Sequence, residues 1–267
     1  MAYVMLSRVQ AKNQLFIVGS LPENKFRASK KCLEELDRLW LRSENNNISE
    51  WEQSSDSIKI AVLNIHSLLD KAVHVKEDEV LQFSDVICLS ETWLKDDAPK
   101  SELDINGYEQ HLNSYGCERG KGLAIFYKPD KFTVSGTVKL SDLQISCLSS
   151  SDIDILTIYR SASCKNAFKN IAEMLNPDKT TIVCGDFNIC FLKKTNNVLI
   201  QSLLNLGFEQ KVTTATHFQG GLIDHVYHRN GKSHFDVKVN LYSPYYTAFD
   251  HDALCITLKK NNNTTWF

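Results

Sequence analysis

Val183-Cys184-Gly185-Asp186-Phe187-Asn188 is the stretch that indicates the fold. The residues at 180–184 are β-branched or small, which predicts a buried strand. Side chains two residues apart on a strand point to the same side, so we expect Asp186 and Asn188 to project together from its end. A carboxylate can deprotonate a water molecule and an amide can donate to a phosphate oxygen, a combination that suits phosphodiester hydrolysis. The alternative is an ordinary turn, because Asp and Asn are common turn formers.

Other apolar, strand-like runs carry polar side chains at comparable places, in order along the chain. The run 58–63 ends at Asn64, 85–90 ends at Glu91, 154–158 ends at Tyr159 and Arg160, 223–227 contains Asp224, and Asp250 and His251 precede the run 253–258. Each of these residues has a structural explanation by itself, such as a strand-end hydrogen bond or a buried tyrosine. The series as a whole does not arise easily by chance, and it predicts one site to which several strands contribute.

The pattern between these runs indicates helices at 68–83, 165–175 and 198–206 and a strand at 122–128. Gly207 is a predicted helix stop. Strands that are separated partly by helices and partly by short turns favour two mixed sheets packed face to face, with helices outside. The sequence therefore predicts an α/β fold whose site lies where strand ends from both sheets meet.

The series resembles the endonuclease/exonuclease/phosphatase superfamily, which includes deoxyribonuclease I, AP endonucleases and non-LTR retrotransposon endonucleases. The retrotransposon branch is the most similar. Its habitual Asn-x-x-Ser-Leu and Ser/Thr-Glu-Thr-Trp-Leu occur here as Asn64-Ile65-His66-Ser67-Leu68 and Ser90-Glu91-Thr92-Trp93-Leu94. The resemblance covers about residues 58–258 and implies a DNase I-like four-layer α/β sandwich of two mixed β-sheets flanked by helices.

The resemblance also implies a Mg²⁺-dependent DNA endonuclease, with Mn²⁺ as a substitute metal. Such an enzyme nicks one strand and leaves 3′-hydroxyl and 5′-phosphate ends. Glu91 would hold the metal, with Asn64 assisting at the metal or its water. Asp186 would position or deprotonate the attacking water, and Asn188 would donate to the phosphate.

The remaining residues of the series have supporting roles in the same scheme. His251 would stabilise the pentavalent phosphorane, and Asp250 would hold its ring and favour the protonated form. Tyr159 would contact phosphate, and Asp224 would orient another catalytic group. Thr216 matches a threonine that lies near the DNA in the retrotransposon branch.

The formal net charge of −2 is unusual for a protein that binds DNA, because phosphate contacts call for a basic surface. Arg119 with Lys121, and Arg160 with Lys165 and Lys169, are candidate clusters for the DNA backbone. Solvated loop charges are the alternative explanation of these clusters. A local basic groove is compatible with a nearly neutral chain, so the charge count neither favours nor excludes DNA.

Composition is typical of a globular enzyme, with 43% hydrophobic and 23% charged residues. The sequence shows no apolar run of about 18 residues that could span a bilayer and no signal-peptide pattern. Four of the eight cysteines, Cys88, Cys147, Cys184 and Cys255, fall within strand-like runs and are expected to be buried thiols. We therefore expect a monomeric, intracellular, nuclear protein that is not secreted and has no membrane partner.

The first residues have a different character. Tyr3-Val4-Met5-Leu6-Ser7-Arg8-Val9 resembles motif VI of RecD-like superfamily 1B helicases, and Arg8 would match its nucleotide-contacting arginine. The chain has no Gly-x-x-x-x-Gly-Lys-Ser/Thr loop, so it should not hydrolyse ATP alone. The predicted organisation is a helicase remnant at 1–41, a linker at 42–57, the endonuclease/exonuclease/phosphatase domain at 58–260 and a tail at 261–267.

A helicase remnant before a retrotransposon-type endonuclease resembles the end of a Helitron-like, Helentron-type transposon protein. DNA and a separate or parental helicase are the partners that this resemblance implies. His66 stands where AP endonucleases carry Asp, which weakens a role in abasic-site repair, and Phe249 stands where the retrotransposon branch has Ser. Two alternatives stay open: a phosphatase that acts on a small phosphorylated or lipid substrate, and a non-catalytic nucleic-acid- or protein-binding relic.

Overall fold

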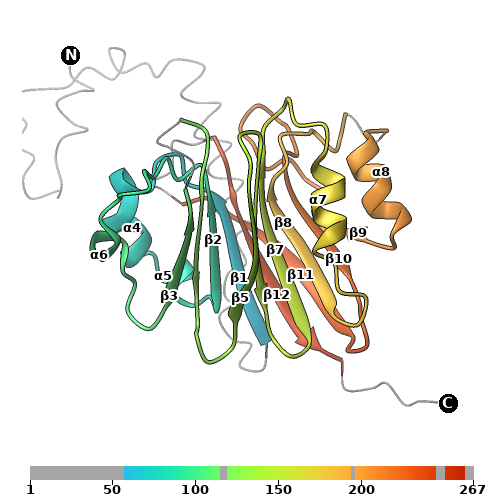
Figure 1. Cartoon of the computed structure of the whole chain (residues 1–267), viewed down its shortest axis with the longest axis horizontal. Helices are drawn as coiled ribbons and strands as arrows, with labels where there is room; N and C mark the ends of the chain where they lie inside the picture. Colours follow the sequence, from blue (N-terminus) through green and yellow to red (C-terminus); the bar gives the residue numbers. More distant parts are fainter. Residues whose placement is uncertain (1–56, 115–118, 194–195, 245–249, 262–267) are drawn as a thin grey trace, which may run out of the picture. The chain divides into compact units, whose positions relative to one another are not determined.

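The computed structural model describes residues 57–114, 119–193, 196–244 and 250–261 (Figure 1). The chain divides into two units, Met1–Asn45 and Asn46–Phe267, and every described residue belongs to the second. The predicted helicase remnant, residues 42–56 of the predicted linker, residues 262–267 of the predicted tail and Phe249 lie outside the described residues. The first strand begins at Ser57, one residue earlier than predicted.

Two six-stranded sheets form the centre of the described unit. The first has the order β11-β12-β1-β2-β4-β3, and the second has the order β5-β6-β7-β8-β10-β9. The first sheet consists of β1 (Ser57–Asn64), β2 (Val86–Ser90), β3 (Glu109–Asn113), β4 (Leu123–Tyr127), β11 (Phe235–Tyr242) and β12 (Ala253–Lys260). The second consists of β5 (Thr133–Lys139), β6 (Leu143–Ser149), β7 (Ile153–Arg160), β8 (Thr180–Asp186), β9 (Glu209–Gln210) and β10 (Asp224–Arg229). Both are mixed, because β1 and β2 are parallel, β7 and β8 are parallel, and the other pairs are antiparallel.

The sheets pack face to face, and helices cover their outer faces (Figure 1). Side chains alternate along β1, so Ile60 and Val62 face the inter-sheet core while Ala61 and Leu63 join the outer cluster. Burial on both faces explains the continuous apolar runs in the sequence. The outer helices are α4 (Ala72–Glu77), α5 (Glu79–Gln82) and α6 (Lys100–Leu103) on the first sheet, and α7 (Ala167–Glu173) and α8 (Val198–Asn205) on the second. The predicted four-layer architecture is confirmed.

The prediction of a single helix over residues 68–83 is wrong. The segment contains a 3₁₀ turn, η3 (Leu69–Lys71), followed by α4 and α5. Asp78 interrupts the helix with an extended backbone (φ −73°, ψ 107°), and its side chain accepts a hydrogen bond from Leu81 N at 3.1 Å. An aspartate in this conformation begins a new helix as its N-cap, which the apolar periodicity does not indicate.

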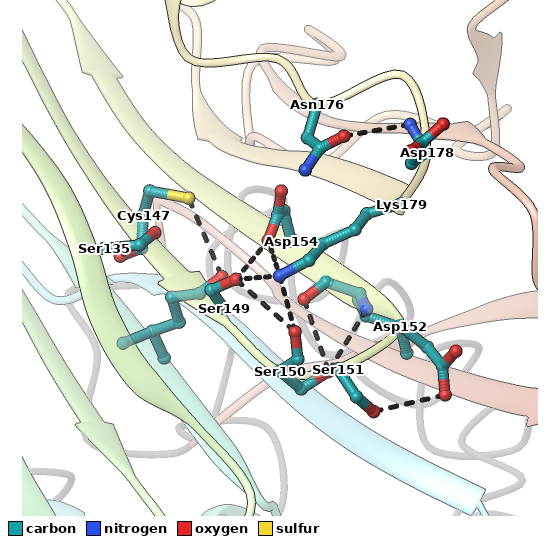
Figure 2. Close-up of polar contacts among 12 residues, drawn as sticks. Ser135, Cys147, Ser149, Ser150, Ser151, Asp152, Asp154, Asn176, Asp178 and Lys179 are labelled. Atoms are coloured by element: carbon teal, nitrogen blue, oxygen red, sulfur yellow. Dashed lines mark hydrogen bonds and ion pairs between the residues drawn. The ribbon is translucent and has the colours of Figure 1, made fainter.

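A polar network joins the end of β6 to the starts of β7 and β8, and its side chains are drawn in Figure 2. Ser149 Oγ donates to Asp154 Oδ1 at 2.5 Å, and Lys179 Nζ donates to Ser149 Oγ at 2.5 Å and forms an ion pair with Asp154 at 3.4 Å. Asp154 is near the start of β7 and Lys179 directly precedes β8, so the network stands at the far ends of these strands from Tyr159 and Asp186. Its groups satisfy one another, which indicates a structural role.

The described cysteines are free thiols, and the four that were predicted to be buried are buried. Burial raises the pKa of Cys147 to about 11, so its thiol stays protonated near neutral pH. None of the helices in the described part is both long and apolar enough to cross a membrane.

Candidate active site

The strand registers bring the predicted residues to one end of the two sheets. On the first sheet Asn64 pairs with Ser90 in the parallel β1–β2 ladder, which places Asn64 beside Glu91 at the same edge. On the second sheet Asp186 pairs with Tyr159 on β7 and with Asp224 on β10. Because β1, β2, β7 and β8 all end here, the site lies where strand ends from both sheets meet, as the sequence predicts.

Asp186 is the centre of the site, and a hydrogen bond joins it to the other sheet. Its side chain is 1% exposed. Asn64 Nδ2 donates to Asp186 Oδ2 at 3.1 Å, and Asn188 N donates to Asp186 Oδ1 at 2.8 Å. Both carboxylate oxygens are therefore held in place by donors, one of which comes from the first sheet.

The glycine before Asp186 is required by the close approach of β7. Gly185 has φ +130°, and a Cβ built on it would lie 2.0 Å from the carbonyl oxygen of Ile158. No other residue fits this position without moving the backbone. The Gly-Asp pair of the sequence therefore positions the carboxylate against its neighbouring strand.

The ring of His251 is held by Asp224. His251 Nδ1 lies 2.8 Å from Asp224 Oδ2, and Thr216 Oγ1 donates to the same oxygen at 2.7 Å. The prediction that Asp250 holds the ring is wrong, because Asp224 is the hydrogen-bond partner of His251 Nδ1, although the Asp250 charge does raise the pKa of His251 as predicted. The predicted DNA contact of Thr216 is also corrected: the side chain is fully buried and positions Asp224. The expectation that Asp224 orients another group agrees with this geometry.

Burial and neighbouring charges shift the pKa values of both central groups. Burial, then the charges of Asp224 and Glu91, raise the pKa of Asp186 to about 8, although His251 and the Asn188 N–H act in the opposite direction. Burial alone would lower the pKa of His251, but the charge and hydrogen bond of Asp224 and the charge of Asp186 raise it to about 9. The imidazolium is thus the main form at neutral pH.

The structure corrects the predicted roles of Arg160 and Asn188. The Arg160 guanidinium is buried and donates to the carbonyl oxygens of Phe187 (3.0 Å), Ala162 (3.4 Å) and Cys164. It therefore holds the loop after β8 and does not present a cation to DNA. Asn188 lies beyond the end of β8 with φ +50°, and its amide donates to the Arg160 carbonyl at 3.0 Å. Strand alternation consequently does not apply to Asn188.

Glu91, Tyr159 and the loop at 119–122 lie together at the rim. A Cβ built on Gly120 would be 3.6 Å from Tyr159 Oη and 3.9 Å from Glu91 Oε2. Burial and the charges of Glu91 and Asp186 raise the pKa of Tyr159, so its hydroxyl remains a donor. Arg119 and Lys121 flank Gly120 in the sequence, and their contact with DNA stays a prediction.

The donor set fits Mg²⁺. Asn64 Oδ1 is buried and has no hydrogen-bond partner, although its amide nitrogen is paired with Asp186. Glu91, at the neighbouring strand end, is half-buried. Within the described ranges no group of three or more His, Cys, Asp or Glu residues could hold a metal. Mg²⁺ needs no such cage, because it keeps several water molecules and binds through one or two carboxylates plus substrate phosphate.

Two residues at the site were missed by the sequence interpretation. His217 is not among the predicted residues, but its ring lies 4.9 Å from the ring of His251 in a T-shaped arrangement, and the two backbones form a β-bridge. Trp93 was used only as part of a motif. Both residues could have been found from the sequence, because each stands close to a predicted site residue. His217 follows Thr216, and Trp93 stands two positions after Glu91.

Two mixed sheets packed face to face, with carboxylates, amides and an imidazolium at their common end, define a hydrolase of phosphate esters with the DNase I-like fold. The chain belongs to the Endonuclease/Exonuclease/phosphatase family, whose model matches residues 41–249. Its relatives include nucleases, which act on phosphodiester bonds, and phosphatases, and the nucleases generally depend on a divalent metal. No curated protein sequence matches the chain.

Solved structures support the same fold. A 3′-5′ exonuclease, NExo, from Neisseria meningitidis has a TM-score of 0.58 at 18% identity, covering 76% of this chain and 100% of that one. The human Nocturnin catalytic domain has a TM-score of 0.56 at 14% identity, covering 79% and 96%. An AP endonuclease from Archaeoglobus fulgidus has a TM-score of 0.55 at 15% identity, covering 75% and 99%. At these identities the likeness concerns the fold alone.

Proposed function

We propose that this protein is a Mg²⁺-dependent DNA endonuclease that nicks one strand and leaves 3′-hydroxyl and 5′-phosphate ends. The observation that carries the proposal is the hydrogen-bonded set around Asp186, which joins Asn64 of one sheet to Asp186 of the other beside the Asp224–His251 pair. The two Asn-x-x-Ser-Leu and Ser-Glu-Thr-Trp-Leu motifs support DNA as the substrate. The likeness of the fold to an AP endonuclease and a 3′-5′ exonuclease agrees with it.

The charge of each side chain decides its proposed role in the reaction. Asp186 accepts a proton from the attacking water, because its carboxylate is held in place by the donors of Asn64 and Asn188 N. The His251 imidazolium, oriented by Asp224, donates to the phosphate oxygen on which negative charge develops. Tyr159 donates from its hydroxyl at the rim. Glu91 and Asn64 Oδ1 would hold Mg²⁺, which when bound supplies positive charge against the developing charge on phosphate.

A plasmid assay tests the proposal. The full chain should convert supercoiled plasmid to open circles in Mg²⁺, with Mn²⁺ as a substitute, and should not do so in EDTA. Ligation of the nicks by DNA ligase without prior end repair would establish the 3′-hydroxyl and 5′-phosphate ends. Cleavage that persists in EDTA, or folded protein that cuts no DNA in any divalent metal, would contradict the proposed mechanism.

The origin of the chain is a separate part of the proposal. A Helentron-type transposon source would explain a helicase motif VI-like segment ahead of this domain, and nuclear localisation would follow from a DNA substrate. A monomer should suffice, because the proposed residues all come from one chain.

Removing residues 1–40 should leave nicking within about twofold of the full chain, because the family match begins at residue 41. The comparison requires equal concentrations of folded protein, measured by circular dichroism and thermal melting. A large loss of rate with an unchanged melting temperature would show that the segment contributes to DNA cleavage, and the proposed domain boundary would then be wrong.

A further inference from the structure

Three side chains form an aromatic and cationic surface at the rim of the site. The Arg119 guanidinium carbon lies over the Trp93 ring, 5.6 Å from its centroid. The His66 ring approaches the same indole with a centroid separation of 4.3 Å and an interplanar angle of 62°. Arg119 is exposed, and the two rings are half-buried. We call these three residues the rim platform.

Each member of the rim platform directly neighbours the site in sequence or in space. His66 stands two residues after Asn64, and Trp93 stands two residues after Glu91. Arg119 precedes Gly120, whose Cβ position contacts Tyr159 and Glu91. Trp93 N donates to the Lys121 carbonyl at 3.0 Å, which fixes the Arg119 loop against the indole.

The backbone beneath the rim platform is strained. In the part of the chain that the structure describes, five non-glycine residues have positive φ, and four of them lie here: His66 (49°), Ser67 (81°), Glu91 (52°) and Trp93 (54°). A bulky residue such as tryptophan rarely adopts this conformation, and its cost is tolerated mainly where function requires the side chain in one place. The concentration of these residues at one rim indicates that the indole is held there for a ligand.

We propose that the rim platform binds an unstacked nucleotide beside the scissile phosphate. The indole stacks on the base, and Arg119 leaves the ring face to pair with the adjoining phosphate. An exposed cation–π contact is weak, so this exchange costs little, whereas base–aromatic stacking and a guanidinium–phosphate pair are stronger. The inference rests on the proposed nuclease function and makes it more specific, because it requires a nucleobase and not only a phosphate ester.

The experiment measures binding separately from cleavage. A fluorescein-labelled oligothymidylate and an abasic oligonucleotide of the same length are bound to the full chain in EDTA, and their dissociation constants are obtained by fluorescence anisotropy. Trp93→Ala should raise the constant for oligothymidylate roughly 5- to 100-fold and largely abolish its advantage over the abasic strand. Trp93→Phe should keep most of that advantage, since a phenyl ring also stacks.

Arg119→Ala should weaken both strands alike and reduce the slope of log affinity against log salt by about 0.7. Phe83→Ala is the matched control: Phe83 is 52% exposed and precedes β2, at the end opposite Trp93, so its loss should change neither constant. If Trp93→Ala melts at a lower temperature than the unchanged protein, Trp93→Leu is used in its place. A leucine side chain keeps the apolar volume but cannot stack on a base.

Two results would overturn the proposal that the rim platform binds a nucleotide. One is equal weakening of the oligothymidylate and the abasic strand by Trp93→Ala or Trp93→Leu, which would give the indole a purely structural role. The other is an unchanged salt slope in Arg119→Ala. Because the measurement is made without metal, a chain that binds as expected but never nicks plasmid would contradict the proposed cleavage and leave the rim platform supported.

Discussion

Replacing Asp186 by asparagine should lower kcat for plasmid nicking by a factor of about 10²–10⁴, because the positioned general base is removed. The substitution conserves shape but cannot reproduce the hydrogen bonds. Asp186 accepts from both Asn64 and Asn188 N, whereas an amide at this position would turn its NH₂ group toward one of these donors. A moderate loss of stability, about 1–3 kcal/mol, should therefore accompany the loss of rate.

Asp154→Asn provides the matched control for this loss of stability. Asp154 is also a buried carboxylate, 5% exposed, with a serine and a lysine as partners, but it lies at the far end of β7 (Figure 2). This variant should melt at a lower temperature and retain kcat per folded molecule. If Asp186→Asn cuts plasmid at a rate close to that of Asp154→Asn, then Asp186 is not the base.

His251→Ala should reduce kcat by a factor of about 10²–10³, the usual cost of losing one donor to a developing oxyanion, with little change in DNA affinity. His228→Gln is its control, because His228 is also buried but its ring nitrogen Nε2 lies 3.1 Å from Asn230 Oδ1 and not beside a carboxylate of the site. A loss that appears in KM instead of kcat would indicate that His251 contributes to ground-state binding and not to the transition state.

The pH profile tests the partner of His251. The pKa of about 9 means that the ring is protonated below that pH, so activity should fall as the pH rises through about 9. Asp224→Asn removes the carboxylate that favours the charged ring, so the pKa decreases and the alkaline fall should move to lower pH by a unit or more. Asp250→Asn should move it less, because the Asp250 charge contributes least among those that raise the pKa. If the pH at which activity falls is the same in Asp224→Asn as in the unchanged protein, the proposed pairing of Asp224 with His251 is contradicted.

The strand ends could be predicted because buried strands leave a simple pattern. β1, β2, β7 and β8 are buried on both faces, so each appears as a largely apolar run that stops at its polar residue. Whether a residue stands at a strand end depends on this local pattern alone. This is why the positions of Asn64, Glu91 and Asp186 at strand ends could be predicted from the sequence.

The pairing of side chains within the site could not be predicted in the same way. Whether Asp224 or Asp250 contacts the His251 ring depends on the register of β8 with β10 and on the bridge between His217 and His251. The sequence predicted that Arg160 contacts DNA, because this charged residue follows the apolar run of β7. Its true partners, among them the carbonyl oxygens of Phe187 and Cys164, are brought to it only by tertiary packing.

The position of β12 in the first sheet has a consequence for biosynthesis. β12 lies between β11 and β1, although β1 is made first and β12 last among the described strands. While the chain is being translated, one edge of β1 stays without its neighbour, and the His251 ring is still to be added. A ribosome-bound chain that stops before residue 251 would thus lack both β12 and the His251 ring, so the first sheet and the candidate site can be completed only at the end of synthesis.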